Sequence, residues 1–179
     1  MVRKVVAYEL LSIDGIAERP DEFITVFDEA MEENLARVIA TQDSVLLGRR
    51  MYDEWAEFWP TSDIEPFASF INGVEKYVAT SSALKMTWAN STVLDGSLVE
   101  GVTELKHRSG GDIGVHGSIE LTQALIEAGL VDELRLVIAP ALQLHGRRLF
   151  GAGRPTRLTL TSSVVSPSGY LLLDYRVDV

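Results

Sequence analysis

One short segment, in which an apolar run passes through a glycine into a pair of arginines, constrains the fold more than any other. Residues 45–47 are typical of a buried strand, and Gly48 ends that strand. Arg49 and Arg50 follow where a helix should begin. The first backbone N–H groups of a helix are unpaired and attract anions. The segment therefore indicates a site for a phosphorylated ligand such as a nucleotide, although a solvated arginine pair beside a strand would give the same pattern.

Short apolar runs alternate with helical patterns along most of the chain. Strands are expected at residues 5–11, 44–47, 75–79, 91–94, 112–116 and 134–139. A terminal hairpin is expected to pair residues 157–165 with 170–177. Helices are expected at residues 21–40, 50–58, 66–72, 99–107 and 119–128. This order predicts an α/β fold in one domain over residues 1–179, with a mixed, mostly parallel central sheet flanked by helices and an antiparallel edge.

Composition excludes several classes of partner and chemistry. The chain has 26 acidic and 16 basic residues and a net charge of −10, so its diffuse field repels nucleic acid and anionic membranes. It has no cysteine, which excludes disulfides, thiolate metal sites and a cysteine nucleophile, and which suits a reducing cytoplasm. The three histidines lack metal-ligand spacing, so we expect no metal site. No apolar stretch is long enough for a membrane span.

Three junctions that follow apolar strands carry small or phosphate-binding residues: Gly48-Arg49-Arg50, Thr80-Ser81-Ser82 and His116-Gly117-Ser118. Ligands of open α/β sheets bind outside the carboxyl ends of the strands, so one extended nucleotide would reach all three junctions. Each junction also has a plainer interpretation, because such residues cap turns and a lone histidine is more often a structural hydrogen-bonding group. No G-x-G-x-x-G motif follows the first strand, which disfavours the two-halved dinucleotide fold.

Together these junctions resemble the dihydrofolate reductase-like superfamily, specifically the reductase domain of the bifunctional deaminase-reductase of riboflavin biosynthesis. The matching segments follow the family's order along nearly the whole chain: LSIDGIA at 11–17, LLGRRMY at 46–52, ATSS at 79–82, VHGS at 115–118, AGLVDELRLVIAP at 128–140 and GRRLF at 146–150. The GLVDEL and AP segments are the most specific. The deaminase half of such enzymes binds zinc, and the lack of cysteine excludes that activity here.

The resemblance implies an NADPH-dependent reductase of a small heterocycle of the pyrimidine or pterin type, and a homodimer. It places Arg49 on the 2′-phosphate of the cofactor, residues 81–82 near the adenosine, residues 117–119 at the pyrophosphate and the turn at 12–15 beside the nicotinamide. The expected cofactor-binding residues are Ala7, Ile16, Gly48, Arg49, Arg50, Ser81, Ser82, His116, Gly117, Ser118 and Ile119.

The expected catalytic residues are two carboxylates. Asp14 lies in the turn beside the nicotinamide, and Glu32 lies on the first long helix, where folate reductases carry a proton-relay acid. Asp28 is an alternative to Glu32, one helical turn earlier. Asp28 and Glu32 lie on one face of this helix, and such a face is usually solvated.

Some positions depart from the family pattern. Met51 stands where the family often has threonine, and His116 occupies one position of a usual Gly-Gly pair. These departures leave open an alternative function, a non-catalytic nucleotide-binding or ligand-sensing module on the same fold. A riboflavin-pathway substrate also carries a ribose phosphate, for which Arg147, Arg148 and Arg154 are candidates, unless they belong to a solvated loop.

Overall fold

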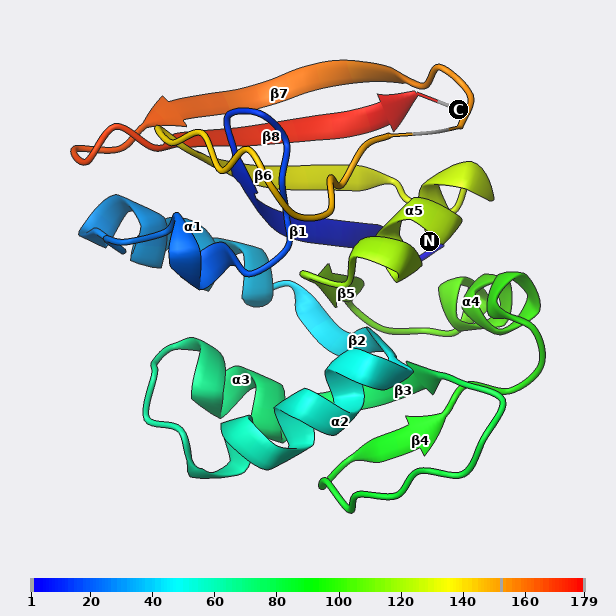
Figure 1. Ribbon diagram of the computed structural model, residues 1–179. Coiled ribbons are helices and arrows are strands. Elements are labelled where there is room, and N and C mark those ends of the chain that lie inside the picture. The colour runs from blue at the N-terminus through cyan, green and yellow to red at the C-terminus, as the bar shows by residue number, and fades with distance from the viewer. Residues whose placement is uncertain (1, 152, 179) are drawn as a thin grey trace.

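The computed structural model describes residues 2–151 and 153–178 and contains one eight-stranded sheet covered by helices (Figure 1). Its strands are β1 (Val5–Ser12), β2 (Gln42–Gly48), β3 (Glu75–Ala79), β4 (Ser91–Val93), β5 (Asp112–His116), β6 (Glu133–Ala139), β7 (Arg157–Val165) and β8 (Leu171–Asp178). Its helices are α1 (Glu29–Ile39), α2 (Arg49–Phe58), α3 (Phe67–Gly73), α4 (Leu98–His107) and α5 (Ile119–Glu127), with short 3-10 turns at η1 (Pro20–Glu22) and η2 (Trp59–Thr61).

The sheet has the strand order β4-β3-β2-β5-β1-β6-β8-β7. Every pairing among β1 to β6 is parallel, whereas β8 pairs antiparallel with β6 and β7 pairs antiparallel with β8. The expected α/β architecture, with a mostly parallel sheet and an antiparallel terminal hairpin, is therefore confirmed. The strand bounds differ from the expected ones by at most two residues at either end.

The expectation of one helix over residues 21–40 is wrong. Only η1 and α1 are helical there, and the residues between them are irregular. Residues 24–26 are three consecutive β-branched residues, which disfavour a helix, and the Val26 N–H donates to the Tyr170 hydroxyl at 3.3 Å instead. Asp28 then starts α1, because its carboxylate accepts a 3.1 Å hydrogen bond from the Met31 N–H.

Two apolar layers, one on each face, cover the sheet. Side chains of α1, α2 and α3 pack on one face, around Met31, Tyr52 and Ile71, and side chains of α4 and α5 pack on the other, around Leu105 and Leu125. Among the described residues, no helix has the length and hydropathy to span a bilayer.

A difference in strand length opens the sheet at one end. β5 ends at His116, which pairs with Tyr8 in the middle of β1. β1 continues to Ser12, but beyond Tyr8 it pairs only with β6, where Ser12 lies opposite Ala139. Within the described part of the chain, the edge of β1 that faces β5 therefore has no strand neighbour after Tyr8, and the sheet has a gap there.

Candidate functional site

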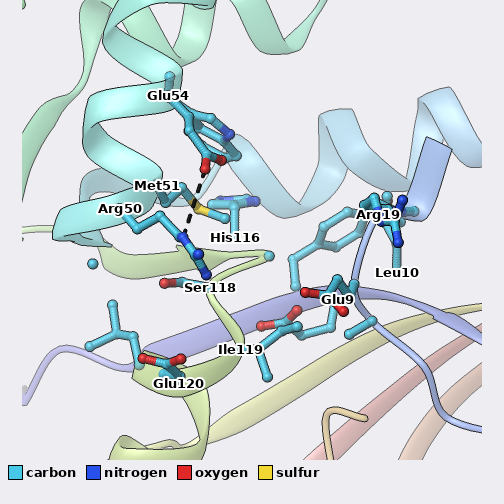
Figure 2. Close-up of a pocket in the computed structure, with 18 of the residues that line it drawn as sticks. Glu9, Leu10, Arg19, Arg50, Met51, Glu54, His116, Ser118, Ile119 and Glu120 are labelled. Atoms are coloured by element: carbon cyan, nitrogen blue, oxygen red, sulfur yellow. Dashed lines mark ion pairs between the residues drawn. The ribbon is translucent and has the colours of Figure 1, made fainter. Parts of the chain in front are cut away.

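A cavity of about 1520 Å³ lies at this opening, at the carboxyl ends of β2, β3 and β5 and beside the free edge of β1. Gly48, Ala79 and His116 contribute to its wall from the three strand ends. In Figure 2, Arg50, Met51 and Ser118 lie together on one side of the cavity, and Leu10 and Arg19 lie on the opposite side. We call the first side, at the starts of α2 and α5, the nucleotide end, and the remainder of the cavity, from His116 across to Leu10 and Arg19, the acceptor end. The cavity is thus where parallel-sheet proteins bind ligands.

Two helices begin in contact with each other at the nucleotide end. Gly48 precedes α2 and Ser118 precedes α5, and neither residue caps its helix through a side-chain hydrogen bond. A Cβ atom on Gly48 would lie 3.1 Å from the Ser118 Oγ, so the two helix starts are close together. Gly117, with φ 67°, makes the sharp turn between β5 and α5. The uncapped N–H groups of both helices can therefore bind one anionic group.

The two arginines of the first junction have different surroundings. The Arg49 Nε donates to Asp53 at 2.8 Å, and its Nη1 donates to the Ser82 Oγ at 2.9 Å. Arg49 thus links the start of α2 to the loop after β3. The first two junctions singled out in the sequence therefore lie next to each other. The Arg50 side chain is 75% exposed, and its Nε lies 4.0 Å from Glu54 (Figure 2). Arg50 therefore has only this long ion pair and is accessible to an incoming phosphate.

His116 is a buried, neutral member of the wall. Its Nε2 lies 2.8 Å from the Gln42 Oε1, and since an amide oxygen only accepts hydrogen bonds, Nε2 carries the hydrogen. Its Nδ1 has no partner among the described residues. Burial lowers the pKa of His116 to about 3. The ring can lie there because position 114 is glycine: a Cβ would collide with the Gln42 amide and lie 2.9 Å from the His116 Nε2.

Five rings form a continuous aromatic wall in the cavity, and we use that name for Tyr8, Trp55, Trp59, Phe67 and His116. The ring centroids of Tyr8 and His116 are 5.8 Å apart, those of His116 and Phe67 are 5.2 Å apart, and those of Phe67 and Trp59 are 4.9 Å apart. The Tyr8 Oη, the Trp59 Nε1 and the His116 Nδ1 are buried and lack partners among the described residues. The face of a flat, uncharged ring would fit this wall.

Glu9 is a buried carboxyl group that the sequence argument missed. It is 1% exposed, it borders the cavity from β1, and its Oε1 accepts a 2.6 Å hydrogen bond from the Thr122 hydroxyl. Its Oε2 has no partner among the described residues. Burial raises the pKa of Glu9 to about 8, although the bond from Thr122 lowers it in part. A lone carboxylate inside the apolar run at residues 5–11 was the available signal.

The structure places the two expected catalytic carboxylates differently. Glu32 is exposed on α1 and lies in the cavity wall. Asp14 lies outside the wall, where its carboxylate accepts hydrogen bonds from the Ser12 hydroxyl at 2.6 Å and from the N–H groups of Gln143 and Leu144, each at 3.0 Å. The Ser12 bond, followed by the backbone bonds, lowers the pKa of Asp14 to about 2. Asp14 thus fastens the turn after β1 to the loop after β6.

Most of the expected cofactor-binding residues meet in one place. The residues that line the cavity are Gly48, Arg49, Arg50, His116, Gly117, Ser118 and Ile119. Ala7 and Ile16 are almost fully buried and do not border it, and Ser81 and Ser82 lie outside its wall. Within the described ranges, no cluster of three histidine or acidic residues is arranged to hold a metal ion.

Solved structures with the same fold include two proteins connected with riboflavin biosynthesis. A provisionally assigned riboflavin biosynthesis protein from Shewanella sp. PV-4 is 16% identical, with a TM-score of 0.81 and 100% of both chains covered. The diaminohydroxyphosphoribosylaminopyrimidine deaminase/5-amino-6-(5-phosphoribosylamino)uracil reductase from Thermotoga maritima is 13% identical, with a TM-score of 0.71, and the match covers 99% of this chain and 57% of that one. The fold is therefore that of the reductase-like α/β proteins.

The chain belongs to the RibD C-terminal domain family, whose model matches residues 3–172. The suspected resemblance is thereby confirmed. Related sequences include two uncharacterized proteins of Bacillus subtilis (strain 168). YyaP is 29% identical over 112 residues, which cover 60% of this chain and 59% of YyaP, and YwjB is 26% identical over 153 residues, which cover 84% of each chain.

Proposed function

We propose that this protein is an NADPH-dependent reductase of a small, flat heterocycle of the pyrimidine or pterin type. The contact between the starts of α2 and α5, at Gly48 and Ser118, carries the proposal. Two uncapped helix N-termini that face one cavity suit a pyrophosphate, and adjacent arginines suit a further phosphate. Membership of the RibD C-terminal domain family supports a reductase.

The residues at the nucleotide end fit the phosphates of such a cofactor. The N–H groups after Gly48 and Ser118 would bind the pyrophosphate, and Arg49 with Arg50 would bind the 2′-phosphate. When bound, NADPH supplies a hydride to the substrate. The aromatic wall would hold the substrate ring flat and exclude water from it.

Reduction of a double bond by a hydride also consumes one proton. Glu32 lies in the cavity wall and is exposed, so it would relay that proton from solvent. We assign no proton transfer to Asp14, because its carboxylate is held by Ser12 and by two backbone N–H groups outside the cavity.

A fluorescence titration with NADPH and NADH tests this function. We expect NADPH to bind more tightly than NADH, because only NADPH carries the 2′-phosphate that the arginines would contact. In the presence of pterin and pyrimidine substrates, we then expect NADPH to be oxidised. Lack of binding by both nucleotides would refute the proposal.

A non-catalytic nucleotide-binding or ligand-sensing module is the second candidate, and one contact favours it. The Met51 Cε lies 3.5 Å from the position of a Cβ on Gly117, so a thioether covers the turn where a pyrophosphate would approach. Selective NADPH binding without oxidation, across the same substrates, would support this alternative over the reductase.

A further inference from the structure

We propose that the acceptor end of the cavity binds an uncharged, flat heterocycle that carries no phosphate group. This inference rests on the proposed reductase function and narrows its substrate class. It also separates this protein from the T. maritima neighbour, whose name specifies a phosphoribosylamino uracil. Three features of the acceptor end carry the argument: its aromatic surface, its carboxylates and the pairing of its arginines.

The surface that would contact the substrate is aromatic and uncharged. The rings of Tyr8, His116, Phe67 and Trp59 follow one another at centroid distances of 4.9 to 5.8 Å. Burial holds His116 in its neutral form by lowering its pKa. The His116 Nδ1 and the Trp59 Nε1 are buried and make no hydrogen bond among the described residues. These uncharged rings suit the face of a flat heterocycle, whereas a phosphate dianion would lose its hydration against them without a compensating cation.

Three of the charged groups next to this surface are exposed carboxylates. Glu65 precedes Phe67 by two residues, Glu32 lies on α1 one turn before Leu35, and Asp21 lies in η1; all three are exposed and line the cavity. Carboxylates at a cavity mouth repel a phosphate ester through their shared sign of charge. The net charge of −10 acts in the same direction.

The arginines outside the nucleotide end are already paired. Arg147 donates to Glu18 and to Glu120, at 2.9 Å each. The Arg19 Nη1 lies 2.8 Å from Glu22. Each of these guanidinium groups therefore already pairs with a carboxylate, and Arg147 bridges two, whereas Arg50 at the nucleotide end has only its 4.0 Å pair with Glu54.

Of the other sequence candidates for a ribose phosphate, Arg148 donates to the Asp14 carbonyl oxygen, and neither Arg148 nor Arg154 lines the cavity. No guanidinium of the described residues is thus left unpaired at the acceptor end to receive a substrate phosphate.

Two ligand pairs that differ only in a phosphate test the inference: riboflavin with FMN, and uridine with uridine 5′-monophosphate. Dissociation constants are measured by calorimetry on the full chain, with saturating NADPH so that the nucleotide end is occupied. We expect one or both unphosphorylated ligands to bind at least about tenfold more tightly than the phosphorylated partner. Equal or tighter binding of the phosphorylated forms, or no binding by any of the four, would overturn the inference.

A matched pair of variants tests the electrostatic part. Glu32→Lys places a cation in the cavity wall, whereas Glu33→Lys makes the same change at the next residue, which is exposed outside this cavity. We expect only Glu32→Lys to strengthen FMN binding relative to riboflavin binding, by about three- to tenfold. Equal effects of the two variants would contradict the inference.

The titration of NADPH alone is a separate measurement. If NADPH fails to bind, the proposed reductase function falls, and the four ligands are then compared without it. Failure of the reductase and failure of the substrate class are therefore distinguishable.

Discussion

The Thr122 hydroxyl on α5 donates a 2.6 Å hydrogen bond to the Glu9 carboxyl group on β1. Glu9 borders the cavity, but no charged partner balances its carboxyl among the described contacts, and its second oxygen has no partner there. The carboxyl is therefore protonated at neutral pH, because burial raises its pKa from 4.5 to about 8. The free energy of unfolding of the protein should therefore depend on pH through Glu9.

We expect Glu9 to destabilise the fold as the pH rises. A carboxyl whose pKa is raised by folding contributes stability that is complete below its unfolded pKa of 4.5 and is lost as the pH rises through about 8. Between about pH 4.5 and pH 9, the free energy of unfolding of Glu9→Gln should rise relative to that of the wild type. The expected rise is roughly 1.4 kcal/mol for each unit of pKa shift, on the order of 3–5 kcal/mol in all. Urea unfolding across that range measures the gain, with Glu33→Gln as the exposed control. A constant difference between wild type and Glu9→Gln would contradict the assignment.

Arg49 and Arg50 are expected to set the preference for NADPH over NADH. Loss of one charge-assisted contact to the 2′-phosphate should weaken NADPH binding by about 1.5–3 kcal/mol and leave NADH binding nearly unchanged. Titration of Arg49→Ala and Arg50→Ala with both nucleotides measures the ratio. Arg108→Ala, at the end of α4 outside the cavity, is the control. An unchanged ratio in both variants would remove these arginines from the phosphate site.

Gly48→Ala is expected to weaken NADPH binding with little loss of stability. The φ of Gly48 is −74°, which alanine adopts freely, but the new Cβ would lie 3.1 Å from the Ser118 Oγ and push the two helix starts apart. We expect a loss of about 1 kcal/mol in NADPH affinity. Adding Ser118→Gly removes the contacting hydroxyl and should restore binding. A single variant with wild-type affinity would show that the spacing of the helices does not matter.

Gly114→Ala is expected to disturb the cavity wall through Gln42. The added Cβ would collide with the Gln42 amide, which must then leave the His116 Nε2. Overpacking of this kind typically costs about 1–3 kcal/mol. In the Gln42→Ala background the colliding amide is absent, so the same change should cost much less, and a double-mutant cycle measures the coupling. Additive effects would mean that the glycine is not needed for the His116–Gln42 contact.

The sequence predicts the order and approximate bounds of the strands and most helices well, because strand periodicity and glycine junctions are local signals. The segment around Gly48 was sufficient to predict a helix start at Arg50, one residue after the observed start, and His116-Gly117-Ser118 preceded a second predicted helix. The prediction of one helix over residues 21–40 was wrong because the helical spacing of apolar residues continues through residues 24–26. There the β-branched side chains and the hydrogen bond to Tyr170 favour an irregular backbone.

The chemistry of the cavity depends on tertiary contacts and was less predictable. Glu9 is on a strand whose composition alone looks apolar, and only its packing against Thr122 identifies it as a buried acid. Asp14 lies in a family-like motif, yet hydrogen bonds to Gln143 and Leu144, 129 and 130 residues away in the chain, turn it away from the cavity.

The early end of β5 has a consequence for how this family can diversify. β1 borders the cavity and is paired with β6 through Ser12. The position of β1 is therefore set by the sheet and not by the loops beside the cavity. The segment before α1 and the stretch between α2 and α3 supply much of the acceptor side and belong to no strand. Grafting these two stretches from one relative to another should exchange ligand preference while the scaffold and the residues proposed to bind NADPH remain in place.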